Sequence, residues 1–476
     1  MKINKLKRII KKNKNFLFIT MFIFSFSIFL LIGMRIENDY LWHIKAGDYM
    51  LKNGILKEDI FSWTLKGHYW MSHEWLFEVI LSLFKKVFGN IHLYVYGFVS
   101  IFSLLMISYL GNMKNYHKNI LFTVIWIVFA IIFSPYMQGR PQLLSYILIS
   151  LTIYFLYDLY NNEDSKKIYF LPLVSLIWAN VHGGSSNLCY IFCFLFFIIG
   201  LFKFEVGKIT SKRLSNKQLK KYLIFGIISF LVIMINPHGL KMITYPYINM
   251  MDSSMISNIN EWHPTDLNIT SHYFYLGYLV FIFLIMMISN KKISFIDLCL
   301  FGISVYLGLK SIRFWCYTFI IMNYVIFNYV NSRKNQYAYF LITAVSVMLV
   351  VTFATHRSYD LNKNYAYLNN DVFKIIKKEK PKRLFNMYDY GGELIYNDIE
   401  VYIDSRADLY SGDFFEDYLV MANLSGDYKK IIEKNNFDYM LIGTNYKIYN
   451  YIKHNEDYKV IYSKDGILLY KKIVNN

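Results

Sequence analysis

Charged side chains are scarce in this sequence. They make up 18% of its 476 residues, whereas 55% are hydrophobic and the mean hydropathy is +0.29. A soluble protein of this length would carry more charge. Several uncharged runs approach the roughly 20 residues that cross a bilayer core, and these runs are 15–34, 93–113, 120–137, 143–157, 188–202, 222–237, 273–290 and 337–355. The sequence predicts an α-helical polytopic membrane protein, with about eleven spans plus interfacial helices.

Cysteine is also rare. The chain has four cysteines, Cys189, Cys193, Cys299 and Cys316, and each lies in an apolar segment. No cluster of other metal ligands accompanies them in the sequence. This usage argues against a disulfide framework and predicts buried free thiols.

Several catalytic motifs are missing. The sequence has no H-E-x-x-H pair and no G-x-S-x-G elbow, and residues 356–476 contain no glycine-rich phosphate loop. These absences argue against a zinc protease, a serine hydrolase and a nucleotide-binding tail. Only folding could bring the scattered histidines and glutamates together around a cation. No cofactor is therefore predicted, and a divalent metal stays open without support from ligand spacing.

Lysine and arginine are distributed unevenly. The stretch MKINKLKRIIKKNK is strongly basic and no small-residue cleavage site follows it, which predicts a retained helix with a cytoplasmic N-terminus. Counting spans from there places the basic or weakly basic segments 113–119, 161–167, 203–221, 290–292 and 331–336 inside. This assignment of loops to the two sides of the membrane holds only if segment 73–89 does not span it. The glutamates and lysines of this segment favour a helix that lies at the membrane–water interface. We expect a multi-pass protein of a bacterial plasma membrane, whose net charge of +18 is an orientation signal rather than a nucleic-acid site.

From about His356 the sequence changes in character. We expect helices at 371–380, 414–423 and 428–436, strands at 383–388, 401–406 and 439–443, and a hairpin that turns at Asp465–Gly466. The segment YDYGGEL is interpreted as a turn only. The sequence thus predicts a transmembrane domain, 1–355, and a small extracytoplasmic α/β domain, 356–476.

Polar residues in the predicted outside loops are the candidate site. They are Glu37, Asp39, His43, His73, Glu74, Arg140, His182, His238, Glu261, His263, Lys310 and Arg313. Each alone has a structural explanation, because such residues end helices, sit at the headgroup level or extend toward water. Their restriction to one face favours a function, because ionisable groups beside lipid are costly.

An enzyme that acts on a lipid-linked phosphate needs cations, a proton-accepting carboxylate and interfacial helices that admit the lipid. Arg140, Lys310 and Arg313 suit the phosphate, and the amphipathic segment 73–89 suits the lipid. Asp39 suits the role of general base, and His43, four residues on, shares its helix face. Asp39 equally suits a helix cap, and that alternative stays open.

The order of these features resembles the GT-C class of integral-membrane glycosyltransferases, in particular the bacterial group related to protein mannosyltransferases and lipid A aminoarabinose transferases. The shared features are a basic N-terminus, one span, an outside loop with an early acidic residue, many further spans and a soluble C-terminal domain. Over nearly the whole chain, similarity to a family of bacterial GT-C-like membrane proteins is carried by DYLWHIKAGDYMLKNGILKEDIFSWTLKGHYWMSHEWLFEVI, GRPQLLS, LIWANVHGG, INPHG, EWHPTDL, SIRF and YIDSRADLY.

The resemblance implies an enzyme of the glycosyltransferase class that moves a hexosyl or pentosyl unit from a polyprenyl-phosphate-linked sugar to a cell-envelope acceptor. Its partners would be these substrates and the lipid bilayer, not nucleic acid. Asp39 matches the catalytic acid of the first outside loop, with His43 and Glu74 beside it in the catalytic set. Many relatives carry two acids there, whereas here Asn38 precedes Asp39, so Glu74 or Glu261 is a candidate partner. The expected substrate-binding residues are Glu37, His73, Arg140, His182, His238, Glu261, His263, Lys310 and Arg313.

Two other functions fit the same residues. A transporter or flippase for lipid-linked cell-envelope precursors would also place charges beside Pro and Gly, although the sequence shows no internal hydropathy repeat. A non-catalytic assembly protein would use the exterior domain to bind wall polymer. Convergence of Asp39, Arg140 and Arg313 in one cavity would favour the enzyme.

Overall fold

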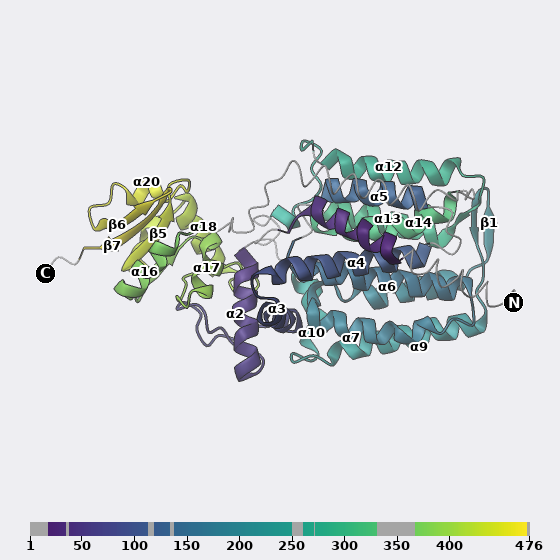
Figure 1. Ribbon diagram of the computed structural model, residues 1–476, viewed down its shortest axis with the longest axis horizontal. Helices are drawn as coiled ribbons and strands as arrows, with labels where there is room; N and C mark the ends of the chain where they lie inside the picture. The colour runs from purple at the N-terminus through teal and green to yellow at the C-terminus, as the bar shows by residue number, and fades with distance from the viewer. Residues whose placement is uncertain are drawn as a thin grey trace. The chain divides into compact units, whose positions relative to one another are not determined.

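The computed structural model describes residues 18–34, 38–112, 119–133, 138–249, 260–270, 272–330 and 367–473. The chain divides into two compact units (Figure 1). Unit 1 comprises Met1–Met34, Asn90–Tyr247 and Ile259–Asp360, and unit 2 comprises Arg35–Gly89, Ile248–Asn258 and Leu361–Asn476. The boundary expected at residue 355 lies outside the described residues and stays a prediction. The grouping of Arg35–Gly89 with the C-terminal residues was not predicted.

Unit 1 is a bundle of helices. Its helices are Phe18–Ile32, α4 (His92–Asn112), α5 (Asn119–Phe133), α6 (Gln142–Asn161), α7 (Leu171–Val181), α8 (Leu188–Gly200), α9 (Asn216–Leu231), α10 (Lys241–Asn249), α12 (His272–Ile288), α13 (Phe295–Lys310) and α14 (Trp315–Tyr329). The core lies around α6 and α14, since α6 contacts α4, α7, α8 and α14. Almost every residue of α14 is buried.

Apolar side chains also cover the outside of unit 1. Val124, Val128 and Ile131 on α5 are exposed, as are Phe281 and Ile288 on α12. By length and composition, three helical stretches among the described residues can cross a membrane: Trp75–Asn112, Gln142–Asn161 and Gly183–Gly200. Shorter apolar helices run over Phe18–Ile32, Leu121–Ile131, Lys167–Val181 and His272–Ile288. These helices support a membrane protein, but the expected number of eleven spans is not confirmed.

Three of the segments that the charge count puts inside contact one another at one end of unit 1. Strands β1 (Phe204–Val206), β2 (Ile209–Ser211) and β3 (Ile293–Ser294) form a small sheet there, with β2 parallel to β3. Lys217 pairs with Asp164 at 2.5 Å. Segments 161–167, 203–221 and 290–294 therefore lie together, which is the arrangement expected of loops on one side of a membrane.

The side on which these loops lie is tested by labelling. We expect a cysteine introduced as Arg213→Cys, in the exposed loop before α9, to resist an impermeant thiol reagent in intact cells. One introduced as Lys459→Cys, exposed on β6 (Tyr458–Lys464), should react. The wild-type chain gives the background from its own thiols, of which Cys299 is partly exposed. Labelling of Arg213→Cys and protection of Lys459→Cys would reverse the predicted orientation.

Unit 2 combines a sheet with helices from both ends of the chain. Its strands β4 (Leu384–Asn386), β5 (Tyr439–Gly443), β7 (Ile467–Lys472) and β6 lie in that order, with β4 parallel to β5 and the others antiparallel. Its helices are α2 (Asn38–Asn53), α3 (Trp75–Phe88), α16 (Asn370–Glu379), α17 (Gly391–Tyr396), α18 (Asp413–Asn423), α19 (Tyr428–Asn435) and α20 (Tyr449–Ile452). One hydrophobic core joins Trp42, Phe61 and Trp70 to the side chains of the sheet.

Most of the expected C-terminal elements form as predicted. The hairpin turns at Asp465 and Gly466, whose positive φ values of 51° and 78° suit a tight two-residue turn. Two expectations were wrong. Residues 401–406 form no strand beyond one bridge from Val401 to Ser62, and YDYGGEL forms a short 3₁₀ helix (Tyr388–Tyr390) and α17. A Cβ at Gly391 would lie 2.4 Å from Cβ of Asp404, so glycine permits this close packing.

Candidate functional site

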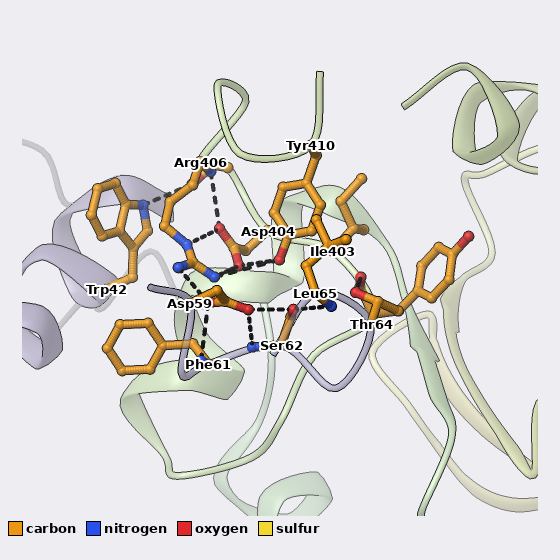
Figure 2. Close-up of polar contacts among 12 residues, drawn as sticks. Trp42, Asp59, Phe61, Ser62, Thr64, Leu65, Ile403, Asp404, Arg406 and Tyr410 are labelled. Atoms are coloured by element: carbon orange, nitrogen blue, oxygen red, sulfur yellow. Dashed lines mark hydrogen bonds and ion pairs between the residues drawn. The ribbon is translucent and has the colours of Figure 1, made fainter. Parts of the chain in front are cut away.

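A buried arginine ties the first loop of unit 2 to its C-terminal part. Figure 2 shows Arg406 between two carboxylates, with its Nη1 2.7 Å from Asp59 and its Nη2 2.6 Å from Asp404. Nε of Arg406 also donates to Asp404, as does the hydroxyl of Tyr410. Ser62 and the backbone N–H of Phe61 donate to Asp59. We call Asp59, Ser62, Asp404, Arg406 and Tyr410 the Arg406 cluster.

Every charge of the Arg406 cluster is removed from water. The side chains of Arg406, Asp59 and Asp404 are 0% exposed. Burial acts to raise the pKa of Asp59, but the Arg406 guanidinium and the hydrogen bonds from Ser62 and Phe61 hold it below its ordinary value. Arg406 also lies over the ring of Trp70, at 4.7 Å. Such a fully bonded buried group fixes the backbone of two loops that are far apart in sequence.

Next to this cluster, carboxylate and imidazole side chains alternate in a series of successive contacts. Glu78 contacts Nδ1 of His43 at 3.3 Å, and Nε2 of His43 lies 3.5 Å from Glu74. The other oxygen of Glu74 lies 3.3 Å from Nε2 of His73, whose Nδ1 lies 3.7 Å from Asp408. We call these five residues the carboxylate–imidazole chain.

Two helices and one loop position this chain. His43 projects from α2, Glu78 lies in the first turn of α3, and Glu74 is the residue before that helix. Burial acts to lower the pKa of His73, but the charges of Glu74 and Asp408 raise it above its ordinary value. Burial raises the pKa of Asp408, against the influence of His73. Both pKa shifts favour the protonated side chains, which are the imidazolium of His73 and the carboxylic acid of Asp408.

A second group of predicted residues lies in unit 1. Arg140, just before α6, pairs with Glu261 at 2.9 Å. Nη2 of Arg313 lies 3.0 Å from Nε2 of His182, at the end of α7, and its guanidinium stacks over Trp262 at 4.8 Å. The Ser311 hydroxyl donates to the Glu261 carbonyl, which joins the two pairs. We call Arg140, His182, Glu261 and Arg313 the guanidinium cluster.

The hydrogen bonds of His182 define its protonation state. A guanidinium only donates, so Nε2 of His182 accepts from Arg313 and the proton lies on Nδ1. That Nδ1–H donates to the hydroxyl of Ser145 at 2.6 Å, with Ser185 at 3.0 Å. Trp178 donates to the same two hydroxyls. His182, which is 1% exposed, is therefore a neutral support for Arg313.

The two guanidiniums of this cluster consequently differ in charge balance. Arg140 is neutralised by the carboxylate of Glu261. Arg313 makes no ion pair with a carboxylate in the described part of the chain and is held by an imidazole and an indole ring. Half-buried and without a carboxylate partner among the described residues, Arg313 suits an anion better than Arg140 does.

The other predicted residues lie apart from these contacts. Asp39 is partly exposed in the first turn of α2, and Lys310 is exposed at the end of α13. The carbonyl of His263 accepts from the N–H of Ile312, which orients the turn before Arg313. His238 is buried, and its N–H donates to Asn236. Glu37 lies outside the described residues.

The structure therefore brings seven of the predicted residues into two groups, one in each unit: His43, His73 and Glu74 in unit 2, and Arg140, His182, Glu261 and Arg313 in unit 1. Asp59, Asp404, Asp408, Arg406 and Tyr410 were not predicted as site residues, and Glu78 was read only as a sign of an interfacial helix. The segments DIFSW and YIDSRADLY, which carry the five unpredicted residues, were noticed only for their family resemblance and, at 401–406, as a predicted strand. In the described ranges, no group of three or more His, Cys, Asp or Glu side chains has the arrangement of a metal site.

Comparisons with known proteins find 13 similar chains among solved structures. A crystal structure of an oligosaccharyltransferase from Archaeoglobus fulgidus, in its apo form, is similar at 11% sequence identity and a TM-score of 0.48. The match covers 89% of this chain and 69% of that chain. No family model matches the chain and no curated protein matches it. At this level of similarity, neither a family nor an activity follows.

Proposed function

We propose that this protein is a membrane glycosyltransferase that moves a hexosyl or pentosyl unit from a polyprenyl-phosphate donor to a cell-envelope acceptor outside a bacterial plasma membrane. One observation carries the proposal: Arg313 presents a positive charge that no carboxylate balances among the described residues. A half-buried charge at the end of apolar helices is costly and is kept where it binds something. A phosphate on a lipid is an anion that such a site can hold.

The geometry around Arg313 suits a phosphate. A guanidinium forms charge-assisted bonds with phosphate oxygens, and its planar fork fixes their orientation. His182 and Trp262 hold Arg313 in place, and neither side chain carries a negative charge that would neutralise the guanidinium. His182 and Glu261 are therefore proposed as positioning residues, and Lys310 as a second, exposed cation. His238 and His263 are proposed to support the same loops.

In the proposed reaction, the acceptor oxygen forms a bond to the anomeric carbon as the bond from that carbon to the phosphate breaks. The polyprenyl phosphate leaves with the negative charge, which Arg313 stabilises most strongly as it develops. The acceptor hydroxyl loses its proton to a carboxylate, and we propose Asp39 for this role, with Glu74 as the second candidate. These assignments are tested by separate variants.

Replacement of Arg313 by glutamine should weaken binding of a polyprenyl-phosphate sugar by roughly 10- to 100-fold, because a charge-assisted bond contributes about 1.5–3 kcal/mol. Titration of the purified protein in nanodiscs with a fluorescent donor analogue measures this. Arg213→Gln, which removes an exposed guanidinium from the loop before α9, is the matched control and should leave binding unchanged.

The comparison with Arg140 makes the test sharper. Because Glu261 already balances Arg140, Arg140→Gln should affect binding less than Arg313→Gln does. Unchanged affinity in a well-folded Arg313→Gln protein would mean that this side chain has only a structural role, and the proposed phosphate site would be rejected.

A further inference from the structure

The carboxylate–imidazole chain becomes more exposed along its length. The side chains of Glu78 and His43 are 1% and 2% exposed, Glu74 is 10% exposed, and His73 and Asp408 are each 17% exposed. Acidic and imidazole groups alternate at every step. This order leads from a buried carboxylate to one that water reaches.

The two ring nitrogens of His73 face different carboxylates. Nε2 faces Glu74 and Nδ1 faces Asp408. An imidazole in this position accepts a proton on one nitrogen and releases another from the opposite nitrogen. His43 is bound between Glu74 and Glu78, and the Ser72 hydroxyl donates to Glu78 at 3.0 Å, so this inner part holds the Glu74 carboxylate in place.

The charged groups on the surrounding elements leave these contacts intact. Arg406 acts on Asp408 but is itself bonded to Asp59 and Asp404. Three lysines of α2 and α3 are engaged elsewhere: Lys45 with Asp398, Lys86 with Asp48, and Lys85 with the Tyr396 hydroxyl. Arg406 fixes the loop that carries Asp408, because the Leu409 N–H donates to the Arg406 carbonyl at 2.9 Å.

We infer that His73 relays protons from Glu74 to Asp408 and so to water. This inference rests on the proposed function, which releases one proton from the acceptor hydroxyl in each turnover. The proton, taken up by Glu74, passes to Nε2 of His73, which lies 3.3 Å away. The Nδ1 proton of His73 then passes to Asp408, once their 3.7 Å separation shortens or a water bridges it, and Asp408 releases it to water. One proton enters and one leaves, and Glu74 and Asp408 return to their starting states. His73 is left with its proton on Nε2, and a ring flip or proton exchange with water restores the Nδ1–H tautomer before the next turnover.

Chemical rescue tests this pathway. His73→Ala should lower the transfer rate at pH 7 roughly tenfold or more, and added imidazole should restore much of it, because the free base fills the place of the ring. Asp408→Asn should lower kcat in the same direction with KM for the donor unchanged, and should move the pH profile. His68→Gln, an exposed histidine in the same loop, is the control and should change neither.

A loss of rate in His73→Ala without rescue, and with an unshifted pH profile in Asp408→Asn, would overturn the relay. If the wild-type protein transfers no sugar, the proposed function fails and the relay is judged by titration alone. The pKa of His73, followed by NMR of histidine-labelled protein, should then fall in Asp408→Asn, because a negative charge that raises it is removed. An unchanged titration would show that His73 and Asp408 are not coupled.

Discussion

Replacement of Arg406 by methionine is expected to destabilise unit 2 by about 3–5 kcal/mol, the usual cost of removing one partner from a buried ion pair. The reason is the environment of its two carboxylates. Asp59 and Asp404 are fully buried and both depend on the same guanidinium. Methionine fills a similar volume, so the loss is one of charge rather than of packing. Unfolding of the purified protein, followed through its tryptophans, measures the effect.

Two controls identify the cause. Arg383→Met removes an exposed guanidinium from the same unit and should leave the melting temperature unchanged. Combining Arg406→Met with Asp59→Asn and Asp404→Asn should recover part of the lost stability, because the unpaired charges are then gone. If Arg406→Met were as stable as the wild type, the Arg406 cluster would not hold the two loops together.

The pH dependence of this effect has a defined sign. Because the pKa of Asp59 is held below its ordinary value in the folded protein, its contribution to stability is complete above that ordinary value and is lost as the pH falls through the lowered one. Without Arg406, the carboxylate is protonated more readily. The difference in stability between wild type and Arg406→Met should therefore shrink on acidification.

Asp39→Asn is expected to lower turnover by roughly 100-fold or more, the scale of losing a general base. Asp39 lies in the first turn of α2, where asparagine keeps the size and polarity of the side chain and loses only a charge interaction of about 0.3–1 kcal/mol, so the start of the helix should be preserved. Expression, melting temperature and donor affinity should match the wild type, while the rate of sugar transfer falls. These four measurements separate a catalytic carboxylate from a structural one.

A near-normal rate in Asp39→Asn would leave Asp39 as a first-turn residue whose charge only favours the N-terminus of α2. Glu74→Gln would then be the next variant, because the Glu74 carboxylate faces both His43 and His73. Glu37 and Glu261 would follow. A fall in the transfer rate together with a clear fall in the melting temperature would instead point to a damaged start of α2.

Local patterns in the sequence predicted much of the fold. Uncharged runs mark helices such as α4, α6 and α12, and Asp-Gly marks the turn between β6 and β7. The failures concern segments controlled by distant contacts. Residues 401–406 have the composition of a strand, but the bonds of Arg406 to Asp404 and to Asp59 hold them in an irregular loop.

The candidate site was predicted residue by residue, but its pairings were not. The spacing of Asp39 and His43 follows from one helix, whereas the contact between His73 and Asp408 joins residues more than three hundred positions apart, which no local pattern reveals. The different charge balance of Arg140 and Arg313 likewise depends on Glu261 and His182, which come from separate loops. Which of the two arginines pairs with a carboxylate therefore depends on the folded structure and not on the local sequence.

The central claim is tested most directly by sugar transfer itself. The purified wild-type protein, incubated with radiolabelled polyprenyl-phosphate sugars and cell-envelope extracts, should place label in an acceptor. Arg313→Gln should lower that transfer at limiting donor, and Arg213→Gln should not. Binding of the labelled donor, or its movement across vesicle membranes, with no label in any acceptor would contradict a glycosyltransferase and favour a transporter or flippase.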